Sequence, residues 1–406
     1  MNITILKKLL LISFFLLIKT VCGQNLIFLW DKTKKENLLP MQTLNTASQH
    51  RILANSARQH PTFTAYFNHE AFKFNDFNQG MYSFYVQQSF NLPQVAQSYR
   101  QWQENLAKNS DLEALIVQNG LKIQLYTAYA DITDCKMWVL LLQKRKSIYQ
   151  QWENIAQSQY NAGISNKIPL LQAKLQQEQL NLSINQKKQL ADIHNINLEY
   201  ISNSKNISVV DSFLLDMVVY LDSSYLQTIN EQTLQNHLYI KQAFQFIAAN
   251  DSKQKNVESQ LLPQVYTQVQ LQVLDKQAMY YGFGFGVTAP IFTQNIKAQS
   301  EQIKQQSKGL KLNLDWNLQT LQAHLTTTAQ QIERLETALR QYKQEILPLA
   351  EQQLAISLKT YQNGDTDYLY FLQSTQQLFQ QQDSYYLLQR EYIQQRILWD
   401  YYLALP

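Results

Sequence analysis

The chain has 406 residues, of which 35 are basic and 31 acidic, and its formal net charge is +4. This balance argues against a nucleic-acid-binding protein, which would need a strong excess of basic residues. Charged residues make up only 16% of the chain, whereas glutamine is abundant. Such a composition is typical of long uncharged, hydrogen-bonding surfaces and is unusual for a cytosolic enzyme.

The first 23 residues are typical of an export signal. Lys7 and Lys8 precede an apolar run from Leu9 to Ile18, and the small residue Gly23 follows. The run is too short for a membrane-spanning helix, which needs about 20 apolar residues. We therefore expect the mature chain to begin at residue 24.

Only one of the two cysteines, Cys135, lies beyond this signal. Cys22 could carry a lipid, but the preceding Lys19-Thr20-Val21 lacks the small and aliphatic residues expected there, so the sequence disfavours lipidation without excluding it. A single mature cysteine forms no internal disulfide. Because Cys135 falls on the apolar stripe of a predicted helix, we expect it to be a buried core residue and not a nucleophile.

Two segments of the first half alternate between apolar and polar residues, which is the period of a two-faced β-strand. They cover residues 62–72 and 81–90, with a turn near residues 75–80. The first of them places Phe63 and Phe67 on one face. The helix expected before them, around residues 44–59, is shorter than its counterpart in the second half.

After the second strand the apolar residues recur with helical spacing. We predict one long helix over residues 92–160 and a return helix over residues 166–202, joined by a sharp turn. Positions spaced by seven, with apolar partners three or four residues on, predict helices that pack along their lengths in coiled-coil fashion. In the first long helix these positions are Leu121, Ala128, Cys135, Leu142, Tyr149 and Ala156.

Residues 203–236 break this pattern, and we predict a linker of short elements. A helix over residues 238–261 leads into a second strand pair at about 264–274 and 280–290. The first strand of this pair has glutamine at alternate positions, which is the two-faced pattern of a membrane strand with one wet side. We expect these glutamines to line a water-filled barrel lumen: Gln264, Gln268, Gln270 and Gln272.

The second half then continues as the first does. We predict a long helix over residues 295–361 and a return helix over residues 367–403. Pro348 should kink the long helix, because proline lacks a backbone N–H. The apolar stripe of this helix runs through Leu314, Leu321, Thr328, Leu335, Tyr342, Leu349 and Ile356.

The two halves match each other, which predicts two tandem structural repeats, residues 24–202 and 237–406. Tyr160 and Gly163 return 201 residues later as Tyr361 and Gly364. The apolar stripes instead match at a shift of 200 residues. The sequence offers no reason for this difference of one residue.

No segment beyond the signal is continuously apolar over the length of a helical span, so we expect any membrane crossing to be made by strands. Four strands cannot close a barrel, and open edges in lipid would leave backbone groups unsatisfied. Two chains would give eight strands with a filled interior, whereas about twelve strands leave room for water. The expected fold class is an α+β membrane protein in which three chains share a twelve-stranded β-barrel, continued by a coiled-coil helical tube.

No site for chemistry stands out. The six histidines have no paired spacing of metal ligands. The glycines at 282, 284 and 286 lie within an alternating strand and do not form a phosphate-binding loop. We therefore expect neither enzyme activity nor a cofactor.

The order of helix, strand pair, long helix, turn and return helix, given twice, resembles the TolC family of outer membrane efflux channels. The resemblance covers nearly the whole mature chain. The turn segments carry it together with the residues around the second strand pair: Tyr160-Asn161-Ala162-Gly163-Ile164-Ser165, Leu170-Leu171-Gln172-Ala173, Tyr361-Gln362-Asn363-Gly364-Asp365, Tyr368-Leu369-Tyr370-Phe371-Leu372-Gln373, Leu262-Pro263 and Val287-Thr288-Ala289-Pro290-Ile291-Phe292. The second turn segment is most similar to the branch that works with heavy-metal pumps.

This resemblance implies a homotrimer in the outer membrane with a helical tunnel in the periplasm. It implies a passive exit duct that docks to a periplasmic adaptor, or membrane fusion protein, and to an inner-membrane pump of the resistance-nodulation-division type. It does not identify the exported substrate. The docking tip would consist of Tyr160, Asn161, Ala162, Gly163, Tyr361, Asn363 and Gly364.

The resemblance also points to the periplasmic aperture. TolC-like members can carry two aspartates just after the second turn that narrow the mouth and favour cations. The matching positions here are Tyr370 and Gln373, which departs from that pattern. Asp365 and Asp367, on the turn itself, are the substitute aperture candidates.

The alternative class is a periplasmic coiled-coil adaptor or structural protein without a pore. Adaptors of this kind usually have one helical hairpin with β-rich domains around it. Two hairpins and two amphipathic strand pairs favour the channel.

Overall fold

The computed structural model describes residues 26, 28–57, 62–70, 80–205, 207, 231–274 and 278–403. The expected export signal with Cys22, most of the expected linker and most of the two strand turns lie outside these residues.

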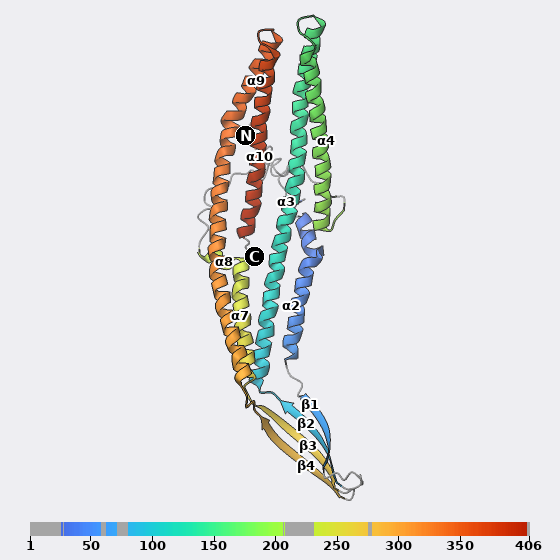
Figure 1. The fold of residues 1–406 in the computed structure, drawn as a ribbon, viewed down its shortest axis with the longest axis vertical. Coiled ribbons are helices and arrows are strands. Elements are labelled where there is room, and N and C mark those ends of the chain that lie inside the picture. The colour runs from blue at the N-terminus through green and yellow to red at the C-terminus, as the bar shows by residue number, and fades with distance from the viewer. Residues whose placement is uncertain are drawn as a thin grey trace, which may run out of the picture. The chain divides into compact units, whose positions relative to one another are not determined.

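The helices and strands follow the predicted order (Figure 1). Pro93 begins α3 and takes a position where the missing N–H is not needed. The fourth strand lies two residues earlier than predicted, because Pro290 cannot donate to a ladder and Ala278 already pairs with Leu274. The elements are α2 (Leu38–Ser56), β1 (Thr62–Glu70), β2 (Met81–Phe90), α3 (Pro93–Asn161), α4 (Ile168–Ser202), α6 (Glu231–Asn236), α7 (Leu238–Ser259), β3 (Gln264–Leu274), β4 (Ala278–Thr288), α8 (Gln294–Gln341), η2 (Tyr342–Ile346), α9 (Leu347–Gln362) and α10 (Tyr368–Leu403).

Two compact units make up the chain, and each combines segments of both halves. Unit 1 contains residues 1–38, 117–237 and 320–406, and with them both helical turns. Unit 2 contains residues 39–116 and 238–319, and with them all four strands.

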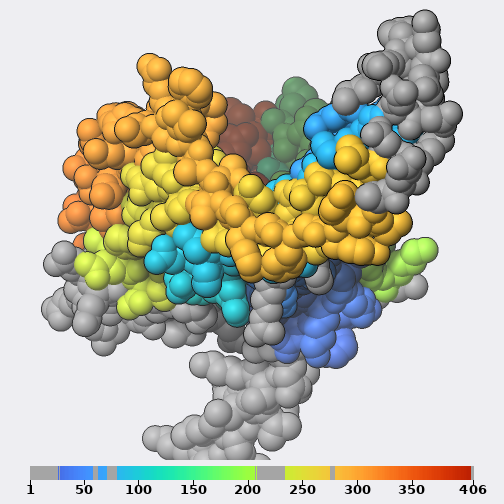
Figure 2. All heavy atoms as spheres, turned by 90° about the horizontal axis from the view of Figure 1, so that it is seen from below, coloured from blue at the N-terminus to red at the C-terminus, as the bar shows by residue number. Residues whose placement is uncertain are grey.

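The strands of unit 2 form one antiparallel sheet in the order β1-β2-β3-β4. Both hairpins pair neighbouring strands of the sequence, and β2 joins β3 from Met81↔Leu274 to Phe90↔Val265. Seen from below in Figure 2, β3 and β4 form a continuous yellow and orange band. The outer strands β1 and β4 each have one neighbour in this sheet.

Small polar side chains join the helices of unit 2. Ser98 Oγ on α3 lies 3.0 Å from Ser259 Oγ on α7. Asn250 Nδ2 on α7 donates to Ser307 Oγ on α8 at 2.8 Å. Because these side chains are short and satisfy one another, helix backbones can approach closely without leaving buried polar atoms unpaired.

The first helix is shorter than its counterpart, as expected, but it begins at Leu38 and not near residue 44. The helix α2 has 19 residues, against 22 in its counterpart α7. Its buried positions are Pro40, Ala47 and Ala54, while Leu38 and Leu39 are exposed. The buried face consists of small residues, so apolar periodicity did not reveal where the helix begins.

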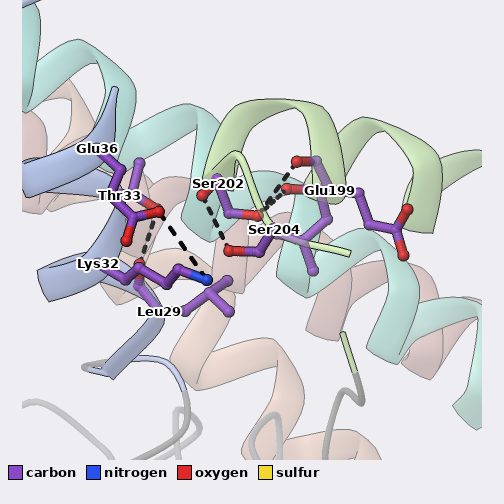
Figure 3. A network of polar contacts seen from close by, with 8 residues as sticks. Leu29, Lys32, Thr33, Glu36, Glu199, Ser202 and Ser204 are labelled. Carbon is purple, nitrogen blue, oxygen red and sulfur yellow. Dashed lines mark hydrogen bonds and ion pairs between the residues drawn. The ribbon is translucent and has the colours of Figure 1, made fainter. Parts of the chain in front are cut away.

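The N-terminal helical segment, residues 28–36, packs in unit 1 against α3 and α4 (Figure 3). Leu29 shares a core with Tyr129 and Leu198. Near the end of α4, Ser202 Oγ donates to Leu198 O at 2.7 Å, and Ser204 N–H donates to Glu199 O. The bond from Ser204 satisfies a carbonyl that the helix end would otherwise leave open.

A π-helical segment, η2, interrupts the second long helix just before Pro348. Pro348 cannot donate to the carbonyl four residues earlier. Leu347 N–H donates to Tyr342 O, one residue farther back than in an α-helix. The interruption expected at this proline therefore takes the form of one additional residue in a helical turn.

This additional residue accounts for the change of shift by one residue along the two long helices. Before η2, the buried positions of α3 and α8 match at a shift of 200, as in Leu125 and Leu325 or Ile132 and Ile332. After it they match at 201, as in Tyr149 and Ala350 or Ala156 and Ser357.

The predicted stripe is consequently wrong beyond η2. Leu349 and Ile356 are each 64% exposed, whereas Ala350 is 7% and Ser357 1% exposed. The π-helical turn rotates the following helix, so that the residues one position later face the core.

Candidate functional site

The two turns of unit 1 have the same backbone geometry. Gly163 N–H donates to Tyr160 O at 3.0 Å, and Ile164 N–H donates to Gln159 O at 3.0 Å. Gly364 and the residue that follows it make the equivalent bonds to the carbonyls of Tyr361 and Thr360. This is a Schellman helix end, which places glycine in the left-handed region. The φ angles of Gly163 and Gly364 are 71° and 80°.

The two tyrosines that precede these glycines differ in burial. Tyr160 is 42% exposed, whereas Tyr361 is 4% exposed. The Tyr361 ring stacks on Phe371 with a centroid distance of 5.8 Å, and Phe371 in turn meets the indole of Trp152. Tyr361 therefore belongs to the core beneath the turns, and Tyr160 belongs to their surface.

This core joins the two hairpins of unit 1. Its members come from α3, α4, α9 and α10, and Gln159 Nε2 also donates across to Tyr361 O at 3.5 Å. Burial raises the pKa of the Tyr361 hydroxyl, and the nearby Trp152 indole opposes that rise. The buried members are Tyr149, Trp152, Ala156, Leu170, Ala173, Ala350, Leu354, Tyr361, Phe371, Leu372 and Leu378.

The remaining tip and aperture candidates lie at the surface of unit 1. Asn161, Ala162, Asn363, Asp365 and Asp367 are exposed around the turns. Tyr370 and Gln373 are exposed on the first turns of α10. The second turn thus presents two carboxylates and the first presents none, while Ile164 and Ile168 give the first turn an exposed apolar surface.

A buried arginine that the sequence analysis did not single out joins α3 to α10. Arg145 Nη2 donates to Phe379 O at 2.8 Å and to Asp383 Oδ1 at 2.6 Å, while Nε donates to Gln382 at 3.1 Å. The spacing of Arg145 from Leu142 and Tyr149 was the available signal, because residues three and four apart share one helix face.

The sheet of unit 2 has one polar and one apolar face. Cross-strand rows on the polar face join Thr64, Gln87, Gln268 and Gly284, and then Tyr66, Tyr85, Gln270 and Gly282. Many side chains of the opposite face are exposed apolar groups, which include Phe63, Phe67, Phe84, Val265, Val269, Met279, Tyr281, Phe283, Phe285 and Val287.

All four glutamines that were expected to line a lumen share the polar face, because they occupy alternate positions of β3. The structure adds neighbours from β1 and β2 that the sequence analysis did not name. Tyr66 and Tyr85 stack at a centroid distance of 4.6 Å, and Gln87 lies opposite Gln268. The same alternation, continued into the first strand pair, would have identified them.

Within the described part of the chain, no group of His, Cys, Asp and Glu side chains could hold a metal ion. Cys135 is buried, and burial raises the pKa of its thiol, as suits an unreactive core residue. Among the helices of the described residues, none combines the length and the apolar character needed to cross a bilayer.

Comparison with solved structures relates this arrangement to known channels. The outer-membrane channel OprN superposes with a TM-score of 0.76 at 11% identity, over 94% of this chain and 90% of that one. CusC, a transmembrane channel, gives 0.77 at 15% identity, over 94% and 92%. The chain has the TolC-family channel fold.

A third channel-fold structure agrees with these two. The outer membrane protein VceC of Vibrio cholerae gives a TM-score of 0.75 at 14% identity, over 95% of this chain and 97% of that one. No protein-family model and no curated protein sequence matches the chain. The predicted resemblance is thus confirmed at the level of the channel fold. The chain shares this fold with the three structures although its sequence identity to each of them is low.

Proposed function

We propose that this chain is one protomer of an outer-membrane exit duct of an efflux system. The observation that carries the proposal is the sheet, which has an exposed apolar face, a polar face rich in glutamine and two outer strands with one neighbour each. An apolar face suits contact with lipid, and a polar face suits a water-filled lumen. The solved channels OprN and CusC, which have this fold, support the same interpretation.

The proposed assembly is a homotrimer with a twelve-stranded barrel. In lipid the outer edges of β1 and β4 must be paired, because unsatisfied backbone groups cost several kcal/mol each. Pairing β4 of one copy with β1 of the next satisfies both edges, and about twelve strands leave an open lumen. An exposed apolar series on α4 supports contact between copies of the helices as well: Leu171, Leu175, Leu182, Ile193 and Ile196.

The helices are proposed to form a periplasmic tunnel. The helix α3 alone has 69 residues, which at about 1.5 Å per residue reach about 100 Å. The two Schellman turns are proposed as the docking tip for a periplasmic adaptor and an inner-membrane pump, with Asp365 and Asp367 at the aperture. The duct is passive, so it has no catalytic residue and no cofactor.

Single-channel recording in planar bilayers tests this function. Purified trimer should give discrete conductance steps, and the absence of conductance from correctly trimeric protein would contradict the proposal. Deletion of residues 264–290 separates the duct from an adaptor without a pore. A duct protein lacking these strands should fail to insert into the outer membrane, whereas an adaptor should remain assembled and soluble.

A further inference from the structure

The polar face of β4 consists largely of glycine. Gly282, Gly284 and Gly286 occupy successive positions on this face, opposite Gln270, Gln268 and Tyr266 of β3. No other strand of the sheet contains a glycine. A strand gains nothing in stability from glycine, so such a series usually marks a place where another group comes close.

Two of these glycines are covered by side chains of the neighbouring strand. A Cβ atom at Gly282 would overlap the Cγ, Cδ and Nε2 atoms of Gln270. A Cβ atom at Gly286 would overlap the ring of Tyr266. Gln270 and Tyr266 therefore lie along the backbone of β4 instead of standing away from the sheet.

The third glycine provides an internal comparison. A Cβ atom at Gly284 would meet only Gln268 Cβ, at the ordinary contact distance of 3.8 Å. An alanine at this position would displace nothing. The three positions thus share one strand and one face but differ in what covers them.

The polar face also has almost no charge. Among the residues of the four strands, all of which the structure describes, Glu70 is the single Asp, Glu, Lys or Arg. It lies at the end of β1, in the row of Met81 and Leu274. The rest of the polar face offers amide and hydroxyl groups, which bind polar solutes of either charge without an electrostatic barrier.

We infer that Gly282 and Gly286 set the bore of this uncharged passage, because they let Gln270 and Tyr266 lie flat against its wall. The inference rests on the proposed duct function and adds its selectivity. The barrel section passes polar solutes by size and hydrogen bonding, and charge does not select them there. A side chain at either glycine turns its β3 neighbour into the lumen and narrows the passage.

The test is the unit conductance of trimers that carry single glycine substitutions in a parent variant with Asp365→Ala and Asp367→Ala, because the proposed aperture lies in series with the barrel and would otherwise limit conductance. Gly282→Ala and Gly286→Ala should each lower the conductance of this parent by about 1.5-fold or more, since conductance follows pore width. Gly284→Ala is the matched control and should conduct as the parent does. The double variants Gln270→Ala with Gly282→Ala, and Tyr266→Ala with Gly286→Ala, should recover the lost conductance, because no long side chain remains to turn inward.

Several outcomes would overturn the inference. One is equal conductance of the three alanine variants, and another is a double variant that conducts no better than its glycine substitution alone. If an alanine variant yields no trimer, the variants Gln270→Glu and Gln270→Lys test whether this position lines the uncharged passage. Their reversal potentials in a salt gradient should shift in opposite directions from that of the native protein. The absence of any shift would overturn the inference. A native trimer without conductance would instead contradict the duct itself.

Discussion

Arg145 on α3 and Asp383 on α10 join the two hairpins of unit 1 through a contact of 2.6 Å between Nη2 and Oδ1. The arginine side chain is 6% exposed and the aspartate 44%. The guanidinium also lies 4.6 Å from the centre of the Phe379 ring. The hydrogen-bond partners of this buried cation and the ring that it faces therefore lie on one stretch of α10.

Removal of Asp383 should destabilise unit 1 more than removal of the pair. Asp383→Ala leaves a buried guanidinium without its counter-charge and should lower the free energy of unfolding by about 1–3 kcal/mol. The double variant Arg145→Met with Asp383→Ala should cost less, because an apolar side chain then fills the buried site. Urea titration followed by helical circular dichroism measures both. A double variant less stable than Asp383→Ala would contradict this role.

Deletion of Gln344 together with Pro348→Ala should be tolerated, because the deletion removes the additional residue of η2 and the substitution keeps proline out of the helix interior that results. A continuous α-helix would then bring the buried positions before and after this segment into one register. The control is deletion of Lys144, an exposed residue that lies 200 positions before Gln344, on α3. Because α3 has no π-helical segment there to absorb the loss of a residue, this deletion should lower the free energy of unfolding by more than about 4 kcal/mol. Thermal melting and trimer yield compare the two. Equal damage would mean that η2 does not serve the register.

Substitution of the turn glycines should follow the cost of the left-handed conformation. Nothing lies within 4 Å of a Cβ atom at Gly163 or Gly364, so no steric overlap contributes. Asn should be tolerated best, Ala should cost about 1–2 kcal/mol, and Val should cost more. If the tips dock a pump, Gly163→Val should impair efflux in cells while barrel insertion is retained. Equal loss of efflux and insertion would mean that the glycine serves folding alone.

The stability of unit 1 should fall when His237 takes up a proton. Burial lowers the pKa of His237 from 6.5, although hydrogen bonds to the backbone of Tyr401 and Tyr402 oppose this. The unfolded chain therefore binds the proton at a higher pH than the folded chain, and stability decreases as pH falls below 6.5. Urea titrations at about pH 7.5 and 5.5 should show this loss in the native chain and a smaller one in His237→Gln. Equal losses would contradict the assignment.

The elements that are determined by local sequence patterns could be predicted from the sequence. Alternation located both strand pairs, and the spacing of apolar residues located the long helices. The turn glycines were also evident, since a Schellman end needs glycine in the left-handed region. Gln264, Gln268, Gln270 and Gln272 were correctly grouped on one strand face, because that grouping requires only the period of two.

Features that depend on packing between distant segments were not predictable. The small buried residues Ala350 and Ser357 carry no apolar signal, so the stripe was continued through the exposed Leu349 and Ile356. The beginning of α2 was missed for the same reason. Arg145 belongs to the core only because α10 supplies its partners.

Native mass spectrometry of the detergent-extracted protein tests the central claim most directly, because that claim concerns how many chains share one barrel. The account predicts a complex with the mass of three mature chains and no stable smaller form. A stable monomer that keeps its strands in detergent would contradict it, since one chain would then have satisfied the outer edges of β1 and β4 alone.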